Sequence, residues 1–339
     1  MTAVPSVYTS FLSQVAPRLR IPDSAAALMG AYSSRDVKAS MVAQVIGQNQ
    51  YLEYQFLKVI ESISKREQQP SVEAAVVLYG MLNSRNVLIA LQLKRRVRGG
   101  HPEFGGDGKL TLKPPEVLKF ALKAEEAVVS DPNGNPDLAF AAGAVFDMLA
   151  MIVPDLGDAA KGALGQLESA FVHGLRTAKI ASELGGQLKD LMYKKYAFSA
   201  GLLHDLGKVA LGMLSPDYPK FLDEMSKREL PRAIRHHIEG TRFGIHHGVL
   251  SGMIAQASGV FREIAPALTH HHEPYVLRRI NRNHHELSAL VSLATCMASH
   301  FRKVEKTEDQ AFDKWLGPEL EGFRIDRKQI QAVTAKVLL

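Results

Sequence analysis

The chain has 339 residues, of which 46% are hydrophobic and 22% charged, with a formal net charge of +6. This composition is ordinary for a globular protein and supplies ample apolar material for a core. The single cysteine, Cys296, excludes an intramolecular disulfide and indicates a reducing compartment. The first 20 residues lack a basic region followed by an apolar core, so no signal peptide is predicted.

Two amphipathic helices are predicted near the N-terminus, over 36–49 and 51–66, because apolar residues recur every three or four positions. Their predicted core-facing stripes are Val37, Met41, Val45 and Ile46 in the first and Leu52, Phe56, Ile60 and Ile63 in the second. A third helix is predicted to start near Pro70, Ser71 and Glu73, and a fourth covers 85–97.

Breaks and a long apolar segment follow. Gly99 to Pro115 contains five glycines and three prolines, which predicts a loop or linker, and Ser130 to Asp137 predicts a second break. Leu138 to Val153 is strongly apolar but carries Asp147 and is short for a membrane span, so a buried helix is predicted. We therefore predict an all-α protein with segments 1–98, 99–166 and 167–339, no membrane span and a cytoplasmic location.

The stretch GLLHDLGKVAL places His204 and Asp205 side by side among apolar residues. Adjacent positions of one helix point about 100° apart, so at least one of the two should be buried, and a buried polar group needs a partner. A metal ion would satisfy the pair, and so would hydrogen bonds within the protein.

Histidines favour the metal interpretation. Of the 13 histidines, ten lie between His236 and His300, in the segments RHHIEG, GIHHGVLSG, LTHHHEP and NRNHHE and at His300 itself. Imidazole and carboxylate groups suit divalent Fe, Mn and Zn, and carboxylates also bind Mg. Three states stay open: a single or weakly held ion, a full binuclear centre, and hydrogen-bonded histidines without metal.

The order of these motifs resembles the HD superfamily of metal-dependent phosphohydrolases, and more closely its regulatory HDOD branch. SVEAAVVLYGMLNSRNVLIAL, AFSAGLLHDLGKVAL, FGIHHGVLSGMIA and IAPALTHHHEP carry the resemblance. It covers Pro5 to about Arg98 and Leu167 to about Arg302, and leaves 99–166 and the C-terminal tail unassigned. It implies an HD-like helical bundle packed against an N-terminal helical bundle.

The resemblance also implies roles for individual residues. The implied metal ligands are His173, His204, Asp205, His247, His271 and His272. Asp205 is also implied as a catalytic group, and Lys208 stands where the related HD-GYP phosphodiesterases keep a lysine that contacts substrate phosphate.

Three departures weaken the catalytic reading. Thr295 stands where catalytic relatives carry an aspartate ligand, EPYVLRRIN contains no GYP-type motif, and Ser169, beside Glu168, replaces a glutamate ligand of some relatives. With one carboxylate, a second divalent ion should bind weakly. A single ion could then use His173, His204, Asp205 and His247, leaving His271 and His272 to bind anions.

The sequence therefore favours a bacterial signal-transduction adaptor that contacts a signalling protein partner and has a degenerate site. The alternative is a metal-dependent phosphohydrolase acting on a nucleotide or cyclic dinucleotide, which makes a nucleotide the candidate ligand. The basic runs Lys94 to Arg98 and Leu277 to Arg282 are predicted to be solvated helix ends, because cations suit helix C-termini and no nucleic-acid-binding motif accompanies them.

Overall fold

The computed structural model describes residues 5–32, 37–64, 70–98, 114–129, 131, 134–157, 163–187, 191–228, 230, 232–300, 328–330 and 332–333. Within these residues the chain forms helices and no strand, which confirms the all-α prediction. The predicted loop 99–113 and the tail 301–327 lie outside the described residues.

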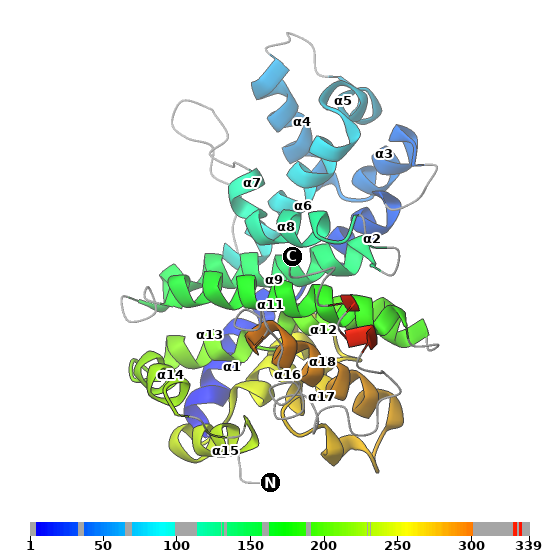
Figure 1. Ribbon diagram of the computed structural model, residues 1–339. Coiled ribbons are helices and arrows are strands. Elements are labelled where there is room, and N and C mark those ends of the chain that lie inside the picture. Colours follow the sequence, from blue (N-terminus) through cyan, green and yellow to red (C-terminus); the bar gives the residue numbers. More distant parts are fainter. Residues whose placement is uncertain are drawn as a thin grey trace.

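The helices fall into an upper and a lower group joined by a middle layer (Figure 1). Helix α1 Ser6–Leu19 lies along the lower group. The upper and middle elements are α2 Asp23–Tyr32, α3 Ala39–Gly47, α4 Gln50–Ser64, α5 Val72–Tyr79, α6 Met81–Arg98, α7 Pro114–Val117, α8 Lys119–Glu126, α9 Pro136–Ile152 and the 3₁₀ turn η1 Val153–Leu156. The lower elements are α11 Ala163–Gly186, α12 Leu191–Leu203, α13 Leu206–Leu214, α14 Tyr218–Ser226, α15 Arg232–Phe243, α16 His247–Ser258, α17 Ala265–Thr269, the 3₁₀ turn η2 Pro274–Leu277 and α18 Arg282–His300.

Local signals explain the upper helices. Ser71 caps α5 by accepting a hydrogen bond from the Ala74 N–H, as the predicted helix start requires. Gly80 has φ of 86°, a conformation that glycine adopts freely, and it lets the chain turn by 114° between α5 and α6. The stripe of α4 is confirmed at Leu52, Phe56 and Ile60, which are buried.

The predicted stripe of α3 is confirmed at Ile46 and wrong at Met41, which is exposed. Val37 and Val45 are partly buried against the core, and Val42, outside the predicted stripe, is fully buried. Because α3 packs mainly on α5, the direction of its buried face is set by that neighbour, and the sequence periodicity alone admits both stripes.

The middle layer connects the two groups. Helix α9 packs against α6 and α8 on one side and against α11 and α12 on the other, so the N-terminal bundle is packed on the HD-like bundle. This helix is long and apolar enough to cross a membrane, but 72% of its most apolar window is buried inside the protein. The prediction of a buried core helix is confirmed.

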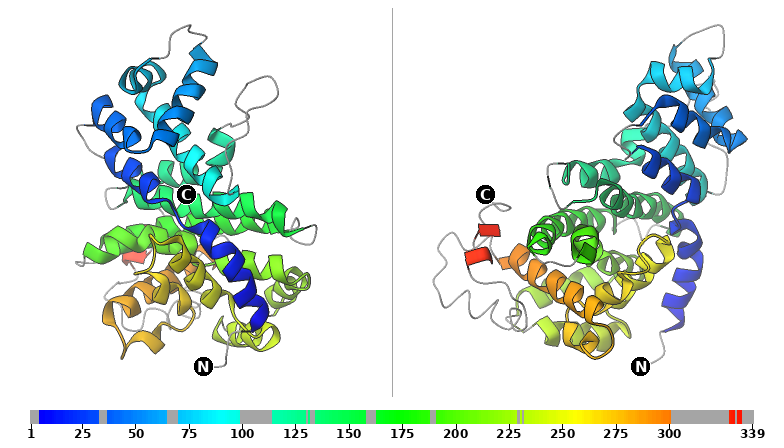
Figure 2. Two further views of the ribbon diagram at one scale, coloured as in Figure 1. Left: turned by 180° about the vertical axis from the view of Figure 1, so that it is seen from behind. Right: turned by 90° about the vertical axis from the view of Figure 1, so that its right-hand side faces the viewer.

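Helix α1 crosses from the upper group to the lower one (Figure 2). It packs against α16, α9 and α13, the Tyr8 hydroxyl donates to the Phe243 carbonyl at 2.7 Å, and the Ile21 N–H donates to the Ser258 carbonyl at 3.1 Å. Segment 1–98 therefore contributes one helix to the bundle formed mainly by residues 163–300, while the division at 98 and 166 stays a prediction.

Asp147 of α9 caps the neighbouring helix α8. Its carboxylate accepts hydrogen bonds from the N–H groups of Phe120 and Ala121 at 3.0 and 2.9 Å. Burial raises the pKa of Asp147 to about 8, against the lowering effect of these two donors.

Asp147→Asn is expected to gain stability relative to the wild type as the pH rises from about 4 to about 8. In this window the carboxyl group of the unfolded chain has lost its proton, whereas that of the folded protein retains it. The free energy of unfolding of the wild type therefore falls by about 1 kcal/mol per pH unit, and that of the Asn variant does not. Urea unfolding of both proteins at pH 5 to 8 measures the difference. Glu126→Gln, at an exposed position, is the control. If the free energies of unfolding of Asp147→Asn and the wild type changed in parallel with pH, the raised pKa of Asp147 would be contradicted.

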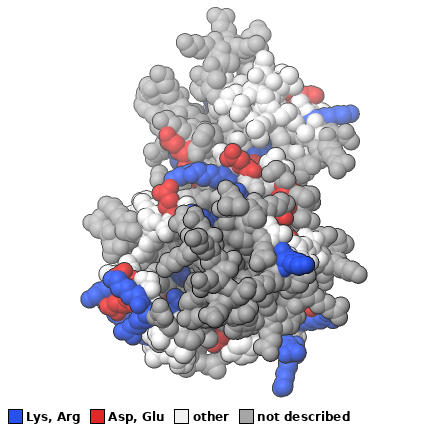
Figure 3. Space-filling model, viewed as in Figure 1, with Lys and Arg blue, Asp and Glu red and all other residues white. Residues whose placement is uncertain are grey.

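The basic runs do not form one surface. Lys94 to Arg98 closes α6 as predicted, and the guanidinium of Arg95 lies 4.2 Å from the centre of the Tyr51 ring. Leu277 ends the short 3₁₀ turn η2, and the basic residues after it lead into α18, which begins at Arg282. The second run therefore does not close an α-helix, and the predicted helix C-terminus is wrong except for the turn η2. On the face shown in Figure 3, several of the described basic side chains lie beside acidic ones, and they form no continuous basic patch. Lys119 and Glu168 form such a pair at 2.8 Å.

Candidate metal centre

The six sequence-predicted ligands come from four parts of the lower bundle, and the structure brings them together. His173 lies on α11, and His247 is the first residue of α16. The adjacent His271 and His272 follow the end of α17. His204 and Asp205 form the turn between α12 and α13, so the prediction that they lie within one continuous helix is wrong.

A close helix contact explains the break. A Cβ atom on Gly207 would lie 1.9 Å from the His247 carbonyl oxygen, so only glycine allows α13 to approach α16 this closely. Ser251 of α16 ties the two parts together, since its Oγ accepts from the Gly207 N–H at 2.8 Å and donates to the His204 carbonyl at 2.7 Å. The contact sets Asp205 beside His247.

Asp205 is the centre of the cluster. One carboxylate oxygen, Oδ1, lies 3.3 Å from Nε2 of His247 and 3.9 Å from Nε2 of His271. The other, Oδ2, lies 3.3 Å from Nε2 of His204 and 3.7 Å from Nε2 of His173. The residues form two overlapping sets of potential metal ligands that share this carboxylate.

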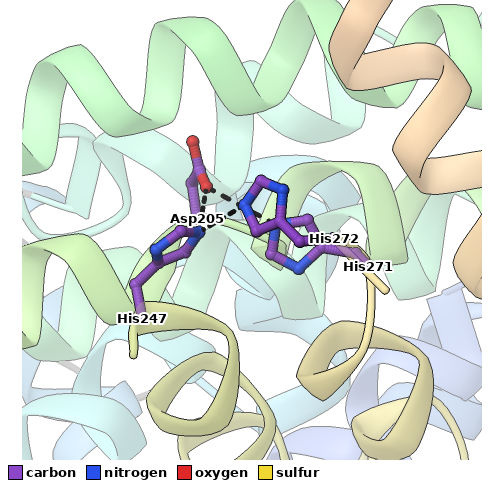
Figure 4. A group of neighbouring side chains, drawn as sticks. All are labelled: Asp205, His247, His271 and His272. Carbon is purple, nitrogen blue, oxygen red and sulfur yellow. Dashed lines mark hydrogen bonds and ion pairs between the residues drawn. The ribbon is translucent and has the colours of Figure 1, made fainter. Parts of the chain in front are cut away.

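His272 completes the set on the Oδ1 side. Its Nε2 lies 2.9 Å from Nε2 of His247, and Figure 4 shows the rings of His247, His271 and His272 gathered around Asp205. Asp205, His247, His271 and His272 each offer one ligand atom within 4.8 Å of the others. We call these four residues the Oδ1 set.

The Oδ2 side differs because it already holds a cation. The Lys208 ammonium donates to Oδ2 at 2.6 Å, and its side chain is 31% exposed. The lysine that the resemblance assigned to substrate phosphate therefore neutralises the shared carboxylate here.

Hydrogen bonds fix which nitrogen each ring presents. The Nδ1 atoms of His204 and His271 lie 2.8 and 2.7 Å from the carbonyls of Gly201 and Leu268, and Nδ1 of His247 lies 2.7 Å from Glu239 Oε2. A carbonyl accepts only from a protonated nitrogen, so Nε2 of His204 and His271 carries the lone pair. Second-shell acceptors orient metal-binding histidines in this manner.

Unpartnered buried atoms mark the space between these groups. Nε2 of His204, Nε2 of His271 and Oδ1 of Asp205 are buried and form no hydrogen bond with the described residues. Lone pairs that face a carboxylate oxygen repel it unless a cation lies between them, so the donors fit a divalent ion. The residues could hold a metal, as the sequence predicts.

The charge states of His173, His271 and His272 suit metal binding as well. Burial lowers the pKa of His173 to about 3, against the pull of the Asp205 carboxylate, and burial also holds the pKa values of His271 and His272 well below the ordinary value. These rings are neutral at pH 7, which is the form that ligates metals. Burial opposes ionisation of Asp205, but its contacts with His204, the Lys208 ammonium and His247 hold its pKa well below the usual range.

Glu239 is a site residue that the sequence analysis did not single out, although it lies in the segment RHHIEG. It is buried, and its Oε2 accepts from the backbone N–H of His247 at 2.9 Å, while Oε1 accepts from the Tyr218 hydroxyl. Burial would lower the pKa of His247, but the charge of Glu239 outweighs it and raises that pKa. Burial favours neutral Glu239, yet His247 and these donors hold its pKa at about 2.

The departures from the catalytic pattern are visible in the structure. The Thr295 hydroxyl is buried and donates to the Val291 carbonyl of its own helix at 2.7 Å. Glu168 is 56% exposed and pairs with Lys119 on the surface. Neither side chain belongs to the two described ligand sets.

Glu239→Gln is expected to weaken divalent-ion binding by about 10- to 100-fold, which is the usual effect of removing a second-shell carboxylate. Both His247 groups reach one oxygen, Oε2, while the Tyr218 hydroxyl donates to Oε1, so the amide removes the negative charge that faces His247 and leaves one acceptor oxygen for three donors. The ring is then held less firmly. Titration with Mn²⁺ measures the effect. Glu224→Gln, which alters an exposed pair with Arg242, is the control, and equal affinities of the two variants would contradict a role for Glu239.

The fold and the site together define an all-α protein with a histidine–aspartate cluster of the HD type. The HDOD domain family model matches residues 19–144 and 148–274, which is more than half of the chain. The chain therefore belongs to the HDOD family. The match includes most of segment 99–166, which the sequence resemblance left unassigned.

Three solved structures are similar to this chain at low sequence identity. A Shewanella amazonensis protein provisionally named a phosphohydrolase is 16% identical, with a TM-score of 0.45 and coverage of 98% of this chain and 93% of that one. An HDOD domain protein from Geobacter sulfurreducens is 16% identical, with a TM-score of 0.43 and coverage of 98% and 94%. The MmoQ response regulator from Methylococcus capsulatus is 18% identical, with a TM-score of 0.34 and coverage of 93% and 98%. No curated protein matches the chain.

Proposed function

We propose that this chain is a cytoplasmic, bacterial HDOD signal-transduction protein that holds one divalent ion and acts through a signalling protein partner rather than by hydrolysis. The observation that carries the proposal is the state of Asp205. It is the only carboxylate among the six potential ligands, and one of its oxygens is already bound by Lys208.

Charge balance argues for one ion. Two divalent ions and the Lys208 ammonium would face a single ligand carboxylate. Among the residues that the structure describes, Glu239 behind His247 is the one further buried carboxylate that contacts a ligand residue. Such an excess of positive charge disfavours a second ion. We therefore propose that the ion binds at the Oδ1 set. This differs from the ligand set expected from the sequence, His173, His204, Asp205 and His247, which left His271 and His272 to bind anions.

The residues of the Oδ1 set suit Fe²⁺, Mn²⁺ or Zn²⁺ better than Mg²⁺, because three of the four are imidazoles. A bound ion would supply Lewis-acid character. Asp205 and the fixed rings orient the ligand atoms, and burial of the cluster excludes bulk water from this side.

A second candidate function is a metal-dependent phosphohydrolase of nucleotides or cyclic dinucleotides. The observation that favours it is the sharing of Asp205 between two ligand sets, since a bridging carboxylate is typical of two-metal sites. In that case Lys208 would have to leave Oδ2 when the second ion binds.

Protein purified without added metal is expected to contain about one divalent ion per chain and to hydrolyse phosphoesters no faster than Asp205→Ala. Elemental analysis measures the first quantity. A panel of nucleotides, cyclic dinucleotides and p-nitrophenyl phosphoesters, assayed with Fe²⁺, Mn²⁺, Zn²⁺ and Mg²⁺, measures the second. Two ions per chain with turnover that Asp205→Ala abolishes would favour the hydrolase, and failure to bind any of these ions would overturn the metal centre.

A further inference from the structure

One ring of the Oδ1 set lacks the support that the other two have. Nδ1 of His247 faces Glu239, and Nδ1 of His271 faces the Leu268 carbonyl. Nδ1 of His272 is buried and forms no hydrogen bond with any described residue. A metal-binding ring usually has its second nitrogen held by an acceptor, so the position calls for one.

His236 offers a hydrogen-bond acceptor, its Nε2, beside the ring of His272. This residue of α15 is 6% exposed, and its Nε2 is buried without a hydrogen-bond partner among the described residues. Its ring centre lies 4.8 Å from that of His272, with 47° between the ring planes. At this separation, small rotations of the rings bring two of their nitrogens within hydrogen-bonding distance.

A third ring limits how His236 can move. The ring of His246 lies 3.6 Å from the ring of His236, centre to centre. His246 is itself fixed, because its Nδ1 accepts a hydrogen bond from the Val249 N–H at the start of α16. His246, His236 and His272 thus form a row of neighbouring, mutually tilted rings that ends at the Oδ1 set.

We propose that His236 is a positioning residue for the metal centre: its Nε2 accepts a hydrogen bond from the Nδ1–H of His272 and so directs Nε2 of His272 toward the ion. This inference rests on the proposed metal centre. It assigns His236 a role in metal affinity without making it a ligand, and it explains why two buried, unpartnered imidazole nitrogens lie in adjacent rings.

The test compares three variants of the full chain: His236→Phe, which keeps a ring and removes the acceptor, His236→Gln, which retains an acceptor oxygen, and His237→Phe, which alters the exposed neighbour on the same helix. Affinity for Co²⁺ is measured by competition with a chelator, and the visible absorption of bound Co²⁺ reports its ligands. Long-range ¹H–¹⁵N spectra of labelled histidine, with His272→Gln as the assignment standard, report the tautomer of His272.

We expect His236→Phe to bind Co²⁺ at least tenfold more weakly with an altered visible spectrum, and His236→Gln to recover most of the affinity. His237→Phe should match the wild type, and wild-type His272 should carry its proton on Nδ1. Unchanged affinity and spectrum in His236→Phe would overturn the positioning role while leaving the metal centre intact. If His236→Phe does not fold, wild-type His272 protonated on Nε2 instead overturns the role. A wild type that binds no Co²⁺ would overturn the metal centre and this inference with it.

Discussion

Asp205→Ala is expected to abolish divalent-ion binding and to lower the free energy of unfolding by about 3 kcal/mol, the cost of removing one partner from a buried ion pair. Among the described residues this carboxylate is the one shared by both ligand sets, and Lys208 loses its partner when it is removed. Metal content by elemental analysis and urea unfolding without metal measure the two effects separately.

Asp217→Ala is the matched control, because Asp217 is exposed and its side chain does not cap α14. An Asp205→Ala protein that retains a stoichiometric ion would mean that the histidines alone form the centre. A stable variant without metal would mean that the carboxylate serves binding only.

Gly207→Ala is expected to be at least as damaging, with a loss of about 3 kcal/mol or more and little soluble protein. The added Cβ would meet two backbone groups of α16, the His247 carbonyl at 1.9 Å and the Ser251 N–H at 2.8 Å. Backbone atoms cannot rotate away, so α13 and α16 have to separate, and this separation also pulls Asp205 from His247.

The control for this prediction is Gly165→Ala, since an added Cβ at that position of α11 meets nothing within 4 Å. There alanine should stabilise the helix by up to about 1 kcal/mol. Thermal unfolding of both variants gives the comparison, and a Gly207→Ala protein as stable as the wild type would contradict the close helix contact.

The sequence predicts the helical class well because apolar periodicity is a local pattern. The six candidate ligands came from the family resemblance, and the structure brings them into one cluster. The turn at His204 and Asp205 could not be predicted, since an uninterrupted apolar pattern surrounds them and the break depends on contact with α16.

The contacts of Glu239 and Lys208 with the candidate ligands are also hard to predict from the sequence, because they depend on how the helices are arranged. Glu239 acts on His247 eight positions later, after the chain leaves α15 and enters α16, and no helical spacing relates the two. Lys208 was predicted from a family role, whereas its contact with Asp205 follows from a single helical turn at the start of α13. Side-chain direction at helix ends decides both contacts.

The path of α1 has a consequence for how the chain can be divided. Its apolar face, with Phe11, Val15 and Leu19, is buried, and the helix is packed on α16, α13 and α9. A fragment cut in the glycine-rich segment after α6 would carry this face away from the surface that covers it. The remaining fragment would expose the matching face of the bundle that contains the histidines. The first helix of the chain thus closes a bundle made mainly from the second half, which ties the two halves into one cooperative folding unit.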